Sequence, residues 1–297
     1  MFKKIPEFRL GKFKVTHKIS DRLIFRVKDE NGADFVLKSP EIIGGIKVNQ
    51  SCSSKSLVVD QYLREKMLLS NFSHPNISET KQVFLSGKEF LLTPYYGKNG
   101  KELIQSLVRK DFQEVLESKT FFENIKHPLV YYKDKLKRDS WLEFVLKGMA
   151  DIGHALMYIH SEGYVHRDVK PANVILSDKS ILIDYGLCSL IGTEIRGISG
   201  SPSYMAPDEV HKERFFGVKK VVPAQDLFSY CVTISNLLTL DVPTVAAKDF
   251  KGLVQYDFYK DCKIIPKLVK RGMVCNPSSW PNLDDLVGSL EDRLRRG

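Results

Sequence analysis

The sequence is poor in cysteine and has no long apolar run. Its five cysteines are spread over 297 residues without a Cys-x-x-Cys pair, a pattern that supports neither a disulfide framework nor a zinc site. Because no run of about 18 apolar residues occurs, we expect no transmembrane helix. Residues 1–6 also lack the apolar stretch of a signal peptide. We therefore expect reduced thiols and a cytoplasmic location, and these features leave export into a host cell open.

A concentrated basic surface is also missing, although the net charge is +9. The 45 lysines and arginines are dispersed among 36 acidic residues, and the densest basic cluster, residues 133–138, is interrupted by Asp134. A nucleic-acid site needs basic side chains gathered on one face. We therefore expect a solvated surface and no nucleic-acid partner. The composition does not indicate an oligomeric state.

Glycine is absent between residues 12 and 31, a region that otherwise has the pattern of β-strands. Apolar alternation predicts strands over 13–19, 23–27 and 34–38. The Asn31-Gly32 turn predicts that the last two of these strands form an antiparallel hairpin. The turn between the first two strands is therefore expected to be free of glycine.

The most informative stretch lies between residues 164 and 186. Two apolar runs, 174–176 and 181–183, flank a polar turn and predict a tight hairpin of short strands. Four polar side chains are expected at the open end of that hairpin, namely Asp168, Lys170, Asn173 and Asp184. Carboxylate and amide oxygens together with one cation are the groups needed to hold Mg²⁺ and a transferring phosphoryl group.

These residues resemble the eukaryotic-type protein kinase family. The run from His166 to Asn173 is similar to the family's H-R-D-x-K-x-x-x-N catalytic loop, and Asp184-Tyr185-Gly186 stands where the family has D-F-G. Tyrosine keeps the ring of the usual phenylalanine, so the role of Asp184 as a metal ligand is not put in doubt. The resemblance extends over about residues 12–293.

The resemblance implies an α+β, bilobal fold. Its small lobe is an antiparallel β-sheet with one main helix, and its larger lobe is mainly α-helical. We expect residues 1–297 to form a single domain, with the small lobe and the hinge at about 12–96 and the large lobe at 97–293.

The resemblance also implies a Ser/Thr protein kinase that uses ATP and Mg²⁺ and has protein hydroxyls as acceptors. Asp168 would orient the acceptor hydroxyl and take its proton, and Lys170 would neutralise the γ-phosphate. Asn173 and Asp184 would hold Mg²⁺. Asp226, in a stretch similar to the family's D-x-W-S-x-G, would brace the backbone of the catalytic loop.

In the expected small lobe, Lys38 ends a strand similar to the family's V-A-I-K and would grip the α- and β-phosphates. A helix is predicted from about 57 to 72, with Leu63, Met67 and Leu68 on one face. Glu65 lies on this helix, nine residues before an H-P-N-I run, and would pair with Lys38.

The hinge that holds adenine is expected at Pro94 to Tyr96, after Thr93 as gatekeeper. Pro94 has no amide donor, but the first hinge position would be used through its carbonyl oxygen. The donor to adenine would come from Tyr96.

The sequence also departs from the family in one loop and at three further positions. The glycine-rich loop that covers the phosphates in the family is missing. The side chain of Arg22 would have to supply the phosphate contact that the amides of this loop normally make. Ser201 stands for the threonine of the G-T-x-x-Y-x-A-P-E pattern, and Asp208 for its glutamate. Trp280 stands where an arginine normally pairs with that glutamate. Changing both partners of an ion pair costs less than leaving one charge unpaired, so we expect an altered brace and an active enzyme.

The resemblance also suggests a point of regulation. Arg167 would pair with a phosphate on the activation segment, where Thr193, Ser199 and Ser201 supply hydroxyls. Two alternatives to a protein kinase remain open at this point: a catalytically impaired pseudokinase that acts as a binding module, for which the missing glycines speak, and a kinase fold that acts on a small molecule.

Overall fold

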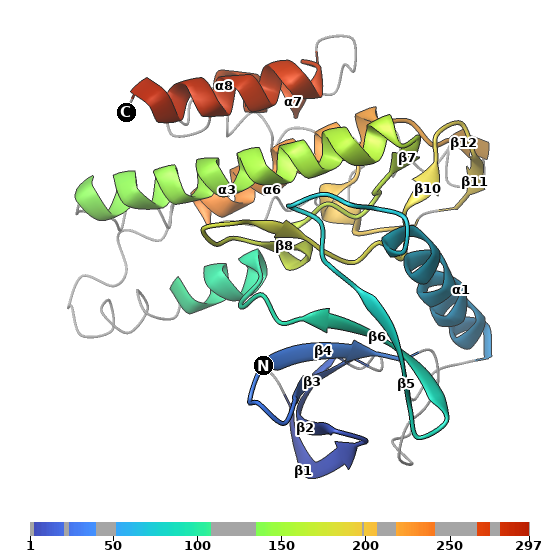
Figure 1. The fold of residues 1–297 in the computed structure, drawn as a ribbon. Helices are drawn as coiled ribbons and strands as arrows, with labels where there is room; N and C mark the ends of the chain where they lie inside the picture. Colours follow the sequence, from blue (N-terminus) through green and yellow to red (C-terminus); the bar gives the residue numbers. More distant parts are fainter. Residues whose placement is uncertain are drawn as a thin grey trace, which may run out of the picture. The chain divides into compact units, whose positions relative to one another are not determined.

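The computed structural model describes residues 3–20, 24–39, 52–107, 135–197, 199–206, 218–240, 266–273 and 280–296. The chain divides into two compact units. Unit 1 comprises Met1–Ser73, Ile77–Gly97 and Asp184–Leu187, and unit 2 comprises His74–Asn76, Lys98–Ile183 and Cys188–Gly297. The α+β class expected from the sequence is confirmed, because an N-terminal antiparallel sheet occurs in unit 1 and a helical C-terminal part in unit 2 (Figure 1).

Unit 1 is built on a six-stranded antiparallel sheet with the strand order β1-β2-β3-β4-β6-β5. The strands are β1 (Lys3–Leu10), β2 (Phe13–Ser20), β3 (Ile24–Lys28), β4 (Asp34–Lys38), β5 (Lys81–Leu85) and β6 (Lys88–Pro94). The predicted hairpin around Asn31-Gly32 is present, since Val27 pairs with Phe35 across β3 and β4. The first strand was not predicted, and it lies at one edge of the sheet.

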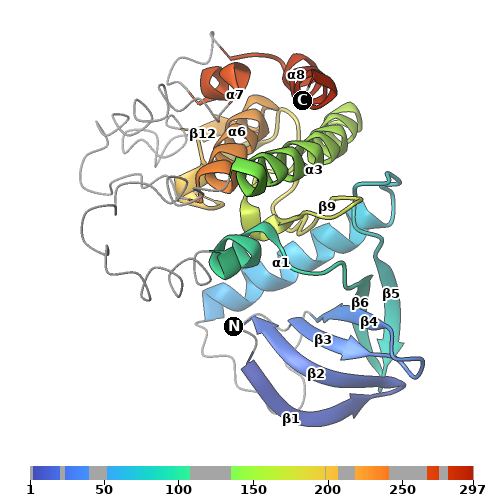
Figure 2. The ribbon, with the colours of Figure 1, turned by 90° about the vertical axis from the view of Figure 1, so that its left-hand side faces the viewer.

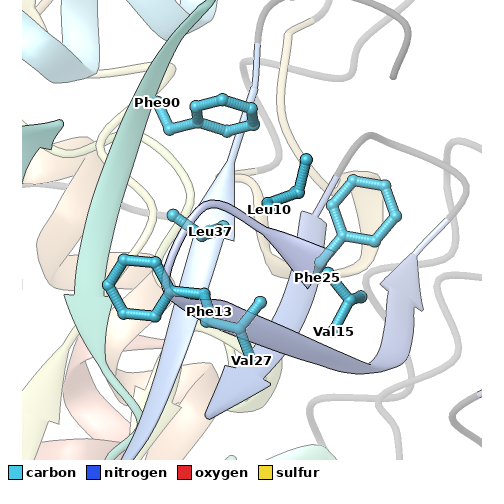
Figure 3. Close-up of a cluster of buried hydrophobic side chains, with 7 residues drawn as sticks. All are labelled: Leu10, Phe13, Val15, Phe25, Val27, Leu37 and Phe90. Atoms are coloured by element: carbon cyan, nitrogen blue, oxygen red, sulfur yellow. The ribbon is translucent and has the colours of Figure 1, made fainter. Parts of the chain in front are cut away.

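One face of this sheet carries the apolar core of unit 1. Seven buried side chains form it: Leu10, Phe13, Val15, Phe25, Val27, Leu37 and Phe90 (Figure 3). Because side chains alternate along a strand, Lys38 and Leu91 project from the opposite face to Leu37 and Phe90. That opposite face is the one that carries Lys38.

Helix α1 (Cys52–Leu69) completes unit 1. It begins five residues before the predicted start at 57, and it ends three residues before the predicted end at 72. The predicted face was wrong in part, because Leu63 and Met67 are each 52% exposed while Leu68 is buried. The helix buries Tyr62 and Glu65 together with Leu68, a spacing of three residues. A polar residue thus belongs to the buried face, which a search for apolar periodicity does not find.

Unit 2 is organised around helix α6 (Ala224–Thr239), which is buried along its length. Helix α3 (Lys135–Ser161) packs against both α6 and α8 (Leu283–Arg296), and α7 (Lys267–Gly272) packs against α6 and α8 (Figures 1 and 2). None of the described helices is long and apolar enough to cross a membrane.

Short strands connect α3 to α6. These elements are β7 (Tyr164–Val165), η2 (Pro171–Asn173), β8 (Val174–Ile175), β9 (Ile181–Leu182), β10 (Ser189–Leu190), β11 (Glu194–Arg196), η3 (Pro202–Tyr204) and β12 (Val218–Lys220). The predicted hairpin is confirmed, because Val174 pairs with Leu182 and Ile175 with Ile181. Strand β7 pairs antiparallel with β10. The chain between β7 and β8 holds three of the four polar residues expected at the open end of that hairpin, namely Asp168, Lys170 and Asn173.

Candidate active site

The candidate site residues fall into two clusters, one in each unit. In unit 2 the backbone after β7 is bent at Arg167, whose φ of 67° is rare for a residue with a side chain. Asp226 at the start of α6 holds this bend, since its carboxylate accepts hydrogen bonds from the backbone N–H groups of His166 and Arg167, both at 2.7 Å. The brace expected for Asp226 is therefore present as a set of hydrogen bonds.

Asp226 is fully buried, so its charge needs strong partners. Burial alone would raise the pKa of Asp226, but the hydrogen bond from His160 and the charge of His160, with further help from His166 and the Arg167 N–H, lower it below the usual value. His160 Nε2 lies 2.9 Å from Asp226 Oδ2. His160 is thus a partner of the buried aspartate.

Asp168 lies at the centre of the unit 2 cluster, with a side chain that is 8% exposed. Its Oδ2 accepts from Lys170 Nζ at 2.5 Å and from Asn173 Nδ2 at 3.0 Å. Asn173 Nδ2 also donates to the Asp168 carbonyl oxygen at 2.8 Å. These bonds join three of the predicted residues within one short segment of chain.

Ser201 completes this cluster from the segment before η3. Its Oγ donates to Asp168 Oδ1 at 3.0 Å and accepts from Lys170 Nζ at 2.8 Å. The approach requires glycine at the preceding position, because Gly200 has a φ of 126° and an added Cβ there would lie 3.0 Å from the Arg167 carbonyl oxygen. A serine hydroxyl thus lies between the carboxylate and the ammonium.

The unit 1 cluster consists of Lys38 on β4, Glu65 on α1 and Asp184. Lys38 Nζ forms an ion pair with Glu65 Oε2, and it lies 3.3 Å from Asp184 Oδ1. The predicted pair of Lys38 with Glu65 is therefore formed. The backbone N–H of Tyr185 also donates to Glu65, which attaches the Asp-Tyr-Gly segment to the helix.

Burial and charge oppose each other in this cluster. Burial alone would lower the pKa of Lys38, but the carboxylates of Asp184 and Glu65 raise it above the usual lysine range. Burial raises the pKa of Glu65, and the charge of Asp184 adds to that rise while Lys38 works against it. The lysine is therefore held as a cation, which is the form that binds phosphate oxygens.

The Asp-Tyr-Gly segment packs closely on α1. The Tyr185 ring is buried and makes an edge-to-face contact with Phe72, with 6.0 Å between the ring centroids. An added Cβ at Gly186 would lie 3.1 Å from Gln61 Cβ on α1, so the helix leaves little room for a side chain. Asp184 itself has a φ of 66°, a strained value of the kind found at functional sites.

The predicted hinge follows β6. Phe35 pairs with Pro94 and Val36 with Thr93, and the Thr93 hydroxyl lies 2.9 Å from that of Thr80. Tyr96 uses its hydroxyl to accept from the Glu79 N–H at 3.0 Å. The Tyr96 N–H has no acceptor among the described residues.

Neighbouring contacts hold the hinge in place. The Tyr95 N–H donates to the Asp34 carbonyl oxygen at 3.0 Å. The Arg26 guanidinium lies over the Tyr95 ring at 4.0 Å and donates twice to the Asp34 carboxylate. Arg26 is thus a supporting residue that the sequence did not reveal, because one of its partners lies on β4 and the other directly after β6.

Asn173 in unit 2 and Asp184 in unit 1 each carry an oxygen atom of the kind that binds Mg²⁺. Both hydrogen bonds of the Asn173 amide to Asp168 use Nδ2, and no described residue donates to its Oδ1. The side chain of Asp184 is 30% exposed. An amide oxygen and a carboxylate are hard oxygen ligands, and Mg²⁺ is commonly bound by one or two carboxylates together with phosphate oxygens and water.

Two of the predicted residues, Arg22 and Asp208, lie outside the described part of the chain. Trp280 is described, and its ring lies over that of Phe228, with 5.6 Å between the centroids. At position 280, for which the resemblance implies an arginine in an ion pair, this chain therefore has a tryptophan in contact with an aromatic ring. Ser189 was not predicted, and its hydroxyl accepts from Arg167 at 3.0 Å.

Each cluster has groups typical of a phosphoryl-transfer enzyme, with a partly buried lysine between carboxylates in one unit and an aspartate beside a lysine and a hydroxyl in the other. A family model described as "Protein kinase domain" matches residues 36–258. Because this match covers well over half of the chain, the chain belongs to the protein kinase domain family, whose members are phosphotransferases. The match begins at β4, after the glycine-free turn.

Similar proteins come from distant organisms. The chain is 24% identical over 291 residues to "Protein kinase kin1" of Schizosaccharomyces pombe, covering 94% of this chain and 29% of that protein. It is 29% identical over 189 residues to "Serine/threonine-protein kinase PknK" of Mycobacterium bovis, covering 61% of this chain and 14% of that protein. It is 28% identical over 156 residues to "Putative serine/threonine-protein kinase R436" of Acanthamoeba polyphaga mimivirus, with 51% of each covered. The chain thus spans about half or less of the length of these relatives.

Proposed function

We propose that this chain transfers the γ-phosphate of ATP to serine and threonine hydroxyls of proteins. The contact between Ser201 and Asp168 carries the proposal. A hydroxyl donates to Asp168 Oδ1 while Lys170 Nζ donates to the same hydroxyl oxygen. A general base must lie within hydrogen-bond reach of the proton that it accepts, and the contact shows that a hydroxyl and this carboxylate fit together.

The reaction follows from these roles. The acceptor oxygen attacks the γ-phosphorus, the bond from that phosphorus to the β–γ bridging oxygen breaks, and ADP leaves with the electron pair. The acceptor proton passes to Asp168. Lys170 stabilises negative charge on the transferred group, and Lys38, oriented by Glu65, binds the α- and β-phosphates.

Asp184 and the amide oxygen of Asn173 would hold Mg²⁺, which when bound neutralises charge on the phosphates. The adenine ring would bind at the hinge through the Pro94 carbonyl oxygen and the Tyr96 N–H. The strained backbone at Asp184 and the contact of Tyr185 with α1 keep this carboxylate beside Lys38.

Incubation of the purified protein with γ-labelled ATP and Mg²⁺ tests the proposal. The acceptors are three peptides that differ only in carrying serine, threonine or tyrosine at one position, in acidic and basic versions. We expect transfer to serine and threonine and at least tenfold less to tyrosine. Transfer to tyrosine alone, or to a small-molecule alcohol but to none of the peptides, would contradict it.

A non-catalytic binding module is the second candidate, and the lack of glycine between residues 12 and 31 favours it. Backbone amides approach phosphate most closely where glycine removes the side chain. This candidate predicts that no label is transferred to any acceptor or to the chain itself. ATP binding without transfer, and binding of neither ATP nor metal, both fit it. The same incubation, combined with calorimetry, separates the two candidates.

A further inference from the structure

Helix α1 is attached to the sheet at a second place, through Glu89 on β6. The Tyr62 hydroxyl donates to Glu89 Oε1 at 3.1 Å, and Lys66 Nζ lies 2.9 Å from Oε2. Tyr62 is 1% exposed, whereas the Lys66 and Glu89 side chains are 28% and 26% exposed. The site described above does not use any of these three residues.

The strand pairing explains why this attachment bears on Lys38. Lys38 pairs with Leu91 across β4 and β6, and Glu89 lies two residues before Leu91. Because side chains two residues apart lie on the same face of a strand, Glu89 and Lys38 project from the same face of the sheet. On α1, Tyr62 lies three residues before Glu65, and Lys66 is the residue directly after Glu65. The two attachments therefore lie side by side on both elements.

The two ion pairs have opposite polarity. In one the helix supplies the acid, Glu65, and the sheet supplies the base, Lys38. In the other the helix supplies the base, Lys66, and the sheet supplies the acid, Glu89. A rotation of α1 that brought Glu65 toward Glu89 would bring two carboxylates together, which is unfavourable. Opposite polarity thus selects a single orientation of the helix.

The ionisation states support this arrangement. The hydrogen bond from Lys66 lowers the pKa of Glu89, as do those from Tyr62 and Gln82 to a smaller extent. Burial raises the pKa of Tyr62, and the charge of Glu89 adds to the rise. Near neutral pH, Glu89 is therefore an anion and Tyr62 a neutral donor, as the observed bonds require.

We propose that Glu89 is a positioning residue for nucleotide binding, which acts by anchoring α1 through Tyr62 and Lys66 so that Glu65 meets Lys38. The proposal rests on the proposed function, because it assigns to Lys38 the binding of ATP phosphates. When the anchor is lost, Glu65 no longer holds Lys38 in one position. The affinity for ATP then falls, while Asp168 in unit 2 and its partners stay as they are.

The test compares Glu89→Gln with the control Asp60→Asn, which also changes an acid to an amide but lies on the exposed face of α1. We expect the KM for ATP to rise about 5- to 10-fold in Glu89→Gln with kcat changed less than twofold, and both constants to stay at wild-type values in Asp60→Asn. Lys66→Gln is expected to act like Glu89→Gln, and the double variant no more strongly than either, because both single changes break the same contact. Additive effects, or a loss confined to kcat, would overturn the proposal.

Direct binding separates this proposal from the proposed function. Calorimetry with Mg²⁺-ATP measures the affinity whether or not phosphate is transferred. If the wild-type chain binds ATP without transferring phosphate and Glu89→Gln weakens binding, the proposed function fails and the anchor stands. Amide hydrogen exchange over residues 61–69, measured without nucleotide, should be faster in Glu89→Gln than in the control. Equal exchange and equal affinity would overturn the anchor.

Discussion

The two clusters of site residues are assembled in different ways. In unit 2, Asp168, Lys170 and Asn173 come from a stretch of six residues, and Asn173 Nδ2 bonds both the carbonyl oxygen and the carboxylate of Asp168. In unit 1, Lys38 meets Glu65 from 27 positions away and Asp184 from 146 positions away. The first cluster follows from local backbone geometry. The second forms only after a sheet, a helix and a distant segment have packed together.

Because of this difference, substitutions are expected to affect the two clusters in different ways. A local cluster is held by its own hydrogen bonds and by one brace from α6, so a change within it acts on chemistry directly. A cluster assembled from three segments depends on everything that holds those segments, including contacts that touch no substrate. In unit 2 we therefore expect a substitution in the cluster to change the rate of phosphoryl transfer directly. In unit 1 we expect substitutions of neighbouring residues to change the affinity for ATP as well.

The largest effect is expected from the local cluster. Asp168→Asn should lower the rate of phosphoryl transfer by about 10²- to 10⁴-fold, roughly 3 to 5 kcal/mol of barrier, because the amide cannot accept the hydroxyl proton. Affinity for ATP should stay within about twofold of the wild type, measured by calorimetry. Equal transfer rates in variant and wild type would remove Asp168 from the reaction.

The matching change in unit 1 should act on binding. Lys38→Ala is expected to weaken ATP binding by about 10- to 100-fold, roughly 1.4 to 2.8 kcal/mol, since residues 12–31 include no glycine that would let a backbone amide approach the phosphates closely. Chelation of Mg²⁺ should weaken binding further. Lys81→Ala, which removes an exposed lysine from β5, is the control and should bind as the wild type does. Tight, metal-independent binding that survives Lys38→Ala would shift the weight to the binding-module candidate.

A smaller effect is expected at Trp280, which stands where the resemblance implies an arginine. Trp280→Ala should lower the free energy of unfolding by about 2 kcal/mol, because it removes a large ring that lies over Phe228. Trp280→Phe should lose less than half of that amount. Chemical denaturation at low and high salt measures both, and a strong salt dependence of the wild-type contribution would argue against a contact between rings.

The smallest effect concerns acid stability. The pKa of Asp226 is lowered in the folded state from its ordinary value of 3.8, so its contribution is fully present above about pH 4. That contribution is lost as the pH falls through the lower folded-state pKa. Asp226→Asn should therefore reduce stability most at neutral pH, and the gap to the wild type should narrow as the pH falls from 5 to 2. Thermal unfolding across this range checks the sign, and a gap that widens in acid would contradict it.

The unit 2 cluster could be predicted almost completely from the sequence. The residues from His166 to Asn173 and the hairpin after them are close together in the chain, so their spacing fixes which side chains meet. The partners that were missed, His160 and Ser189, contact this stretch through hydrogen bonds between separate elements. No local pattern distinguishes them from ordinary polar residues.

In unit 1 the pattern of residues was enough to predict the strands around Asn31-Gly32, including the strand that carries Lys38, and the helix that carries Glu65. It did not determine which face of α1 is buried, because Leu63 and Met67 have the apolar pattern yet lie in solvent, whereas Glu65 is buried with Tyr62. The buried face is set by the packing of α1 in the folded unit, where Glu65 pairs with Lys38 on β4. A buried carboxylate is tolerated where a lysine compensates its charge, and here that lysine lies on a different element of the fold.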